Sequence, residues 1–200
     1  MTLLVVVLSY LIGSVPVGYL IVQLKKGLDV RSVGSGNMGA TNVMRAAGRS
    51  GALLTLILDV AKGYSAVLFA GLLTDNGARA IALSALAVIL GHVLPIYLKF
   101  RGGKGVATGV GIFLYLATIP ILIALVVFLI VVGLSRYVSL GSMLGAASFP
   151  ILYYLLDYSR QPSPWILFAA CFCSGLIIMT HHENIRRLMA GTERKFAGAK

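Results

Sequence analysis

The chain has 200 residues, of which 58% are hydrophobic and only 12% are charged, and its mean hydropathy is +0.94. This balance excludes an ordinary soluble domain and predicts an all-α integral membrane protein with one membrane domain over residues 1–200. Lysine and arginine number 17 against 6 acidic residues, which gives a net charge of +11. A nucleic-acid partner is excluded because the sequence has no soluble basic segment interleaved with aromatic residues.

Charge-poor apolar runs mark the expected membrane helices. They lie at residues 1–24, 50–74, 80–98, 105–135, 137–156 and 161–180. The first run has no basic residues before it and is long enough to span, so we expect a retained helix and not a cleaved signal. Glycine and proline at 13–18 predict a kink or a close helix contact inside it.

The run at 105–135 decides the topology. A single helix of this length would be about 45 Å long, whereas the hydrocarbon core is about 30 Å thick. Two short helices would meet at Thr118–Ile119–Pro120, but a long helix can also tilt, so length leaves both open. Two helices leave only Arg79 and Arg160 in the outside loops, as the positive-inside rule favours. We therefore expect seven transmembrane helices, with the N-terminus outside and the C-terminus in the cytoplasm.

Three segments rich in glycine, polar and basic residues separate the apolar runs. We call them island one (34–42), island two (100–108) and island three (181–187). Glycine lets backbone N–H groups approach an anion closely, and nearby lysine and arginine supply charge. In the seven-span layout all three islands face the cytoplasm. They predict a composite site for phosphate groups at the membrane surface.

Island one carries the strongest signal. Its glycines and hydrogen-bonding side chains are Gly34, Ser35, Gly36, Asn37, Gly39, Thr41 and Asn42. Thr41 or Asn42 would cap a following helix, whose N-terminus favours an anion, and Arg45 would lie on the face of Asn42. The residue order is not that of a nucleotide-binding P-loop. The alternative is a glycine-rich turn at the membrane interface.

Islands two and three add charged side chains. Lys104 lies among Gly102, Gly103 and Gly105, which suits a phosphate ligand better than a plain lipid anchor. His181 and Asn184 would share a helix face, and a histidine can bind phosphate or act as a base. Arg186 and Arg187 are expected to be membrane anchors. No metal site is expected, because no carboxylate cluster supports the histidines.

Other polar residues favour structural roles. Asp59 and Lys62, three residues apart inside a span, predict a paired charge within the helix bundle. His92 in the next span is expected to be a hydrogen-bonded structural histidine. Asp29 either orients Arg31 or is solvated, and the sequence leaves this open.

Three motif groups resemble the bacterial acyl-phosphate:glycerol-3-phosphate acyltransferases, a family of small membrane enzymes. They are 34–42 with Arg45, 91–95 continuing to 100–108, and 181–188 followed by 191–196. The resemblance implies transfer of a fatty acyl group from acyl phosphate to sn-glycerol 3-phosphate. The products would be 1-acyl-glycerol 3-phosphate (lysophosphatidate) and phosphate, in phospholipid biosynthesis at the bacterial inner membrane. It implies no cofactor, and functional coupling to the enzyme that makes acyl phosphate.

The resemblance also implies residue roles. The catalytic residues would be Ser35, Lys104 and His181. Substrate and phosphate binding would fall to Gly34, Gly36, Asn37, Gly39, Thr41, Asn42, Arg45, Gly102, Gly103, Ser142 and Asn184. The general base stays open between His181 and a substrate phosphate.

Two other classes of membrane protein fit the sequence less well. An organic-anion transporter would have polar residues throughout its bundle, whereas the outside half of this one is poor in them. A CDP-alcohol phosphotransferase needs clustered aspartates to hold metal. The aspartates of this chain are far apart in sequence, at Asp29, Asp59, Asp75 and Asp157.

Overall fold

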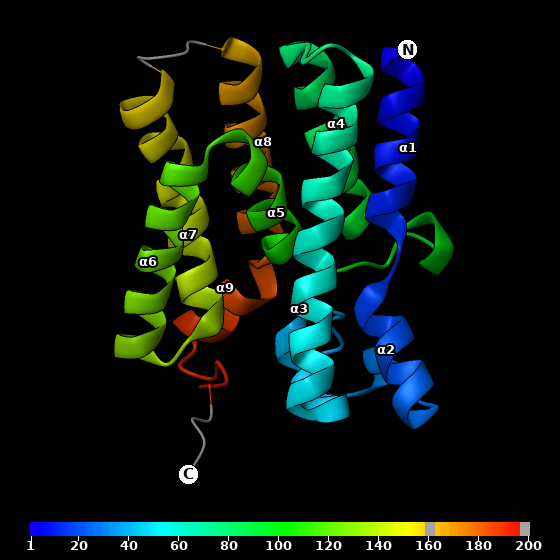
Figure 1. Cartoon of the computed structure of the whole chain (residues 1–200). Coiled ribbons are helices and arrows are strands. Elements are labelled where there is room, and N and C mark those ends of the chain that lie inside the picture. Colours follow the sequence, from blue (N-terminus) through cyan, green and yellow to red (C-terminus); the bar gives the residue numbers. More distant parts are fainter. Residues whose placement is uncertain (159–162, 197–200) are drawn as a thin grey trace. The chain divides into compact units, whose positions relative to one another are not determined.

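The structure, a computed structural model, describes residues 1–158 and 163–196. Every element described is a helix, which confirms the all-α prediction (Figure 1). The chain divides into two compact units, Met1–Tyr115 and Leu116–Lys200, which are considered one at a time. The single membrane domain stays a prediction.

The first unit begins with a broken helix. It contains α1 (Thr2–Ser14), α2 (Val17–Lys26), the 3-10 helix η1 (Val30–Ser32), α3 (Ala40–Leu73), α4 (Ala78–Val93), the 3-10 helix η2 (Ile96–Leu98) and nearly all of α5 (Val106–Leu116). The ribbon is interrupted between α1 and α2 (Figure 1), where Pro16 has no N–H group to continue the helix. This break is the kink that the sequence predicted.

Glycines let α1 and α4 pack backbone to backbone. A Cβ on Gly13 would collide with the backbone of Val88, and one on Gly91 would collide with the carbonyl of Tyr10. Small residues at such contacts are typical of membrane helix pairs, where van der Waals packing replaces the hydrophobic effect. The Tyr10 hydroxyl also donates to the Leu94 carbonyl at 2.8 Å.

Helix α3 starts earlier than the apolar pattern indicated. It begins at Ala40, inside island one, and its regular geometry is interrupted at Gly48, which has φ 76°. Hydropathy marked only the apolar part because the segment before the interruption is polar and basic. An apolar core lies between α2 and this early segment, and its members include Val22, Met38 and Val43. Island one is therefore built on a packed base.

The second unit is also helical. It contains α6 (Thr118–Ser135), α7 (Val138–Tyr153), the π-helix η3 (Tyr154–Tyr158), α8 (Pro164–Thr180) and α9 (His182–Met189). Ser163 caps α8 by accepting a hydrogen bond from the Ile166 N–H, and Pro164 occupies the first turn as its fixed φ favours. Residues 161–162 of the span expected at 161–180 lie outside the part of the chain described.

The run at 105–135 forms two helices, α5 and α6. The break falls at Ala117, one residue before the expected turn, and Pro120 lies in the first turn of α6. Helix α5 has 11 residues, or about 16 Å, roughly half of the hydrocarbon thickness. Over the described ranges, five helical segments are long and apolar enough to cross a membrane, or six if α8 and α9 count as one bent span. The chain is a multi-pass membrane protein, while seven spans and their orientation stay predictions.

Candidate functional site

Island one is organised around the side chain of Asn42, which is 1% exposed. Its Oδ1 accepts the Ser35 N–H at 2.9 Å, and its Nδ2 lies 3.1 Å from the Val30 carbonyl and 2.9 Å from those of Val33 and Asn37. Three carbonyls on one side and an N–H on the other fix the orientation of the amide. Asn42 therefore holds both ends of the loop to the start of α3.

The loop uses several of its own N–H groups internally. Besides the Ser35 N–H, the Gly36 N–H donates to Val33 and the Gly39 N–H donates to the Asn37 side chain at 2.7 Å. Gly34 and Gly36 have φ of 61° and 70°, a conformation that suits glycine. These two glycines shape the turn, and their part in binding an anion stays a prediction.

Arg45 lies beside this loop. A Cβ on Gly34 would be 3.3 Å from the Arg45 Cδ atom, so the arginine stem runs along the glycine. The guanidinium belongs to an exposed residue, and Ser35 is exposed as well. A hydroxyl and a permanent positive charge are thus both exposed at the surface of island one.

The expected helix cap is wrong in its residue. Gly39 is the N-cap of α3, with no side-chain cap, while Thr41 and Asn42 lie within the first turn. Asn42 is drawn away from capping because its amide is committed to the loop. Thr41 is half-buried in this turn.

The open question about Asp29 is resolved by its contacts. Its carboxylate binds Arg31 in a two-pronged pair, with Nε at 3.0 Å from both oxygens and Nη2 at 2.6 Å from Oδ2. The hydrogen bond from Arg31 holds the pKa of Asp29 below its usual value. Arg31 also stacks over the Tyr19 ring at 5.5 Å. Asp29 thus fixes Arg31 and caps η1 just before island one.

Island two is a tight loop packed against the end of α4. The Gly103 N–H donates to the His92 carbonyl at 3.0 Å. A Cβ on Gly102 would collide with the His92 and Val93 carbonyls, and one on Gly103 would collide with the His92 ring. These glycines are therefore required by packing. Lys104, half-buried, follows them directly.

Island three lies at the bend between α8 and α9, which is 54°. His181 is the residue between the two helices and is 3% exposed. Its Nδ1 lies 2.7 Å from the Ile177 carbonyl, so a neutral ring carries its proton on Nδ1 and its lone pair on Nε2. This tautomer suits a proton acceptor at Nε2.

Glu193 is a residue that the sequence reasoning did not identify. Its carboxylate accepts from Ser139 Oγ at 2.6 Å, Asn184 Nδ2 at 2.6 Å and Arg187 Nε at 2.7 Å. It thereby ties island three to the start of α7. Arg187 is paired here, which corrects its interpretation as a plain membrane anchor. The available signal was an acid, one of two with Glu183, within a basic C-terminal cluster.

Ser142 lies one turn beyond Ser139 on α7. It is 6% exposed, and its hydroxyl donates to the Val138 carbonyl at 2.9 Å, within its own helix. The network of Glu193 thus brings Asn184 to the Ser139 turn of α7. Arg45 and Lys104 belong to the first unit, and Ser142, His181 and Asn184 to the second. A common site for all five stays a prediction.

Acidification tests the role of Glu193. Burial raises the pKa of Glu193, but the hydrogen bonds from Ser139, Arg187 and Asn184 outweigh it and leave the pKa below its usual 4.5. A lowered folded pKa gives stability that is fully present above the unfolded pKa and is lost as pH falls through the folded pKa. In detergent, we expect wild type to unfold at a higher temperature than Glu193→Gln at pH 7, with the gap shrinking below about pH 4. A gap that is constant with pH would contradict this network.

The paired charge predicted inside the bundle is confirmed. Lys62 Nζ lies 2.8 Å from Asp59 Oδ1, and both side chains are buried. His92 is buried too and lies 3.1 Å from the Thr108 hydroxyl, as expected of a hydrogen-bonded histidine.

Among residues 1–158 and 163–196, no three His, Cys, Asp or Glu side chains gather as a metal site would require.

The family follows from comparison with known proteins. A family model described as glycerol-3-phosphate acyltransferase matches residues 3–191. The chain belongs to this family. The resemblance seen in the three motif groups is thereby confirmed.

Relatives in the glycerol-3-phosphate acyltransferase family match over nearly their whole length. The glycerol-3-phosphate acyltransferase of Syntrophotalea carbinolica is 46% identical over 188 residues, which is 94% of each chain. That of Desulforamulus reducens is 46% identical over 199 residues, covering 100% of this chain and 97% of the relative.

Two solved structures share the fold. Both are of PlsY, an integral membrane glycerol 3-phosphate acyltransferase. The glycerol 3-phosphate form has a TM-score of 0.91 and 38% identity, covering 98% of this chain and 96% of the other. The lysophosphatidic acid form has a TM-score of 0.87 and 36% identity, with coverage of 98% and 95%.

Proposed function

We propose that this protein transfers a fatty acyl group from acyl phosphate to sn-glycerol 3-phosphate, releasing 1-acyl-glycerol 3-phosphate and phosphate. The observation that carries the proposal is the near-complete match to glycerol-3-phosphate acyltransferases, together with solved relatives in glycerol 3-phosphate and lysophosphatidic acid forms. The acyl phosphate donor is what the resemblance to acyl-phosphate-dependent glycerol-3-phosphate acyltransferases implies.

Two anions must be held side by side for this reaction. In the proposal, island one and Arg45 bind one phosphate. The loop of Gly102 and Gly103 places the positive charge of Lys104 near the reacting carbonyl. Asn37, Gly39 and Thr41 complete the island-one surface, while Ser142 and Asn184 contribute from the second unit. Asn42 acts by shaping the loop, since its amide is fully used there. Positioning and charge stabilisation would supply most of the rate.

The transfer is direct in this proposal. The glycerol hydroxyl attacks the acyl carbon, a new C–O ester bond forms, and the bond between the acyl carbon and the phosphate oxygen breaks. Ser35 supplies a hydroxyl hydrogen bond and does not carry the acyl group. The hydroxyl proton goes to His181 Nε2 or to a phosphate oxygen of the donor. The Nδ1 contact of His181 supports the first route.

A metal-free assay tests the function. Purified protein, acyl phosphate and glycerol 3-phosphate should yield lysophosphatidate, and the rate should survive exhaustive EDTA treatment. The reason is that the donor is a mixed anhydride with a good leaving group, and the cations needed for two phosphates are arginine and lysine side chains. Loss of activity that a divalent ion restores would contradict the electrostatic mechanism. Absence of product from untreated protein would contradict the function itself.

Orientation belongs to the proposal as well. We place the protein in the bacterial inner membrane with seven spans, the N-terminus outside and the three islands on the cytoplasmic side. This side supplies glycerol 3-phosphate and suits coupling to the enzyme that makes acyl phosphate. The excess of basic residues in the inside segments supports it.

Cysteine labelling tests the orientation. In a background with Cys171 and Cys173 replaced by alanine, Asn76→Cys should react with a membrane-impermeant reagent from outside only. Arg101→Cys and Thr192→Cys should react only after the inside is exposed. All three positions are exposed at the surface of their unit. Labelling of Thr192→Cys from outside would show that residues 105–135 cross the membrane once.

A further inference from the structure

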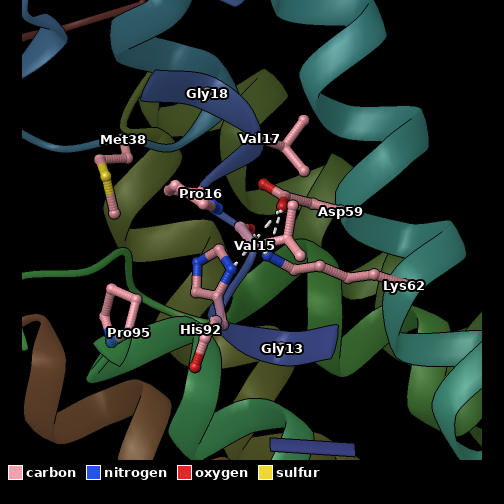
Figure 2. A pocket seen from close by; sticks show the side chains of 11 residues that line it. Gly13, Val15, Pro16, Val17, Gly18, Met38, Asp59, Lys62, His92 and Pro95 are labelled. Carbon is pink, nitrogen blue, oxygen red and sulfur yellow. Dashed lines mark hydrogen bonds and ion pairs between the residues drawn. The ribbon is translucent and has the colours of Figure 1, made fainter. Parts of the chain in front are cut away.

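A buried polar cluster lies inside the first unit, at the break between α1 and α2. Asp59 and Lys62 come from α3 and His92 from α4, and their exposed fractions are 2%, 8% and 7% (Figure 2). Ionisable groups inside a membrane protein are costly, so such clusters usually serve function. The reaction proposed above uses none of these three side chains.

The cluster joins three helices through direct contacts. Lys62 Nζ donates to the Val15 carbonyl at 3.0 Å, at the break before α2, and pairs with Asp59 Oδ1 at 2.8 Å. His92 Nδ1 lies 3.7 Å from the same Asp59 oxygen. Figure 2 shows the lysine, the carboxylate and the ring converging on Val15. The His92 ring thus faces the Asp59–Lys62 pair of α3.

Other contacts of His92 reach island two. Its carbonyl accepts the Gly103 N–H at 3.0 Å, and its ring fills the space where a Cβ of Gly103 would be. Its Nδ1 also lies 3.1 Å from the hydroxyl of Thr108, which is fully buried in the first two turns of α5. Gly103 and Thr108 flank Lys104 in the chain. One histidine therefore fixes both sides of the segment that carries this lysine.

From this geometry we infer that His92 is a positioning residue for Lys104, with its Nδ1 facing both the Thr108 hydroxyl and the carboxylate of the Asp59–Lys62 pair. A glycine-rich loop has little stiffness of its own, and lysine has a long flexible stem. Anchoring the loop at His92 restricts where the ammonium group can lie. A misplacement of about 1 Å can cost about 100-fold in rate, so the anchor matters without touching substrate. The inference rests on the proposed function, in which Lys104 binds an anion.

A double-mutant cycle separates positioning from general damage. We expect His92→Asn and Thr108→Val each to lower kcat/KM by roughly 10- to 100-fold, and Asp59→Asn to lower it in the same direction. Combined with Lys104→Ala, each should add almost nothing to the loss of Lys104→Ala alone, because the positioned group is gone. Multiplicative losses would overturn the inference. Thr108→Ser keeps the hydroxyl and should restore most of the activity lost in Thr108→Val.

Amide hydrogen exchange gives a readout that does not need activity. Exchange at residues 101–105 should be faster in His92→Asn and Thr108→Val than in wild type. Ser84→Ala is the matched control: it is buried in the same helix, and its hydroxyl has no hydrogen-bond partner among the described residues. It should leave both exchange and kinetics unchanged. Unchanged exchange in His92→Asn would overturn the inference, whereas an inactive wild type would overturn the proposed function and leave the exchange result valid.

Discussion

Arg45→Ala and Lys104→Ala should each lower kcat/KM with glycerol 3-phosphate and acyl phosphate by roughly 10- to 150-fold, the equivalent of about 1.5–3 kcal/mol for one charge-assisted contact. Arg45 runs along Gly34 at the surface of island one, and Lys104 follows the anchored glycines of island two. Both side chains supply positive charge next to loops of fixed shape. Steady-state kinetics on folded, detergent-purified variants measure the loss.

Two other basic residues serve as controls. Lys26, at the end of α2, and Arg186, on α9, are both exposed. Lys26→Ala and Arg186→Ala should leave kcat/KM within about 2-fold of wild type, because isolated surface charges contribute little. If Lys26→Ala were as damaging as Lys104→Ala, general surface charge would explain the effect and the islands would have no special role.

The apolar helices were predictable because the membrane imposes a simple rule. Backbone polar groups in hydrocarbon must be satisfied within a helix, so long apolar runs identify helices directly. Glycine and proline at 13–18 predicted a kink or a close helix contact, and the cost of a lone buried charge predicted the pairing of Asp59 with Lys62. Hydropathy does not reveal the polar start of α3 at Ala40, and only the capping residues of island one indicated a helix there.

In the islands, the sequence pointed to the residues but did not reveal the packing and hydrogen bonds that they make. Gly103 is predicted to belong to a phosphate site, and in the structure its missing Cβ also makes room for the His92 ring. Asn42 was expected to touch phosphate, yet its amide is spent on the backbone of its own loop. Both roles depend on contacts between segments that the order of residues does not reveal.

Glu193 illustrates the same limit over a longer distance. Its partner Ser139 is 54 residues away in the chain, and Asn184 is 9 residues away. Composition suggests only that one acid among several basic residues should pair with one of them. The packing of α7, α8 and α9 decides which arginine pairs with Glu193 and brings a serine of α7 to the same carboxylate.

Asn42→Asp should be among the most damaging single changes in the first unit, lowering kcat/KM by at least about 100-fold, since each buried carbonyl left without its donor costs about 1–3 kcal/mol. The change keeps the size of the side chain and the oxygen that accepts the Ser35 N–H. It replaces Nδ2 by an oxygen that faces the carbonyls of Val30, Val33 and Asn37. A carboxylate that is 1% exposed among three carbonyls is both desolvated and repelled.

The loss should fall on activity more than on global unfolding. The loop lies before α3 and not within the helix pairs, so kcat/KM should drop while the thermal unfolding temperature in detergent falls by only a few degrees. Asn76→Asp makes the same chemical change at an exposed position, where the side-chain oxygen accepts from Tyr115 at 3.5 Å and an aspartate oxygen still accepts. It should behave as wild type. Losing even one buried hydrogen bond of this kind costs about 1–3 kcal/mol. If Asn42→Asp retained more than about a tenth of wild-type kcat/KM, the contacts of Nδ2 with these carbonyls would therefore not be what shapes island one.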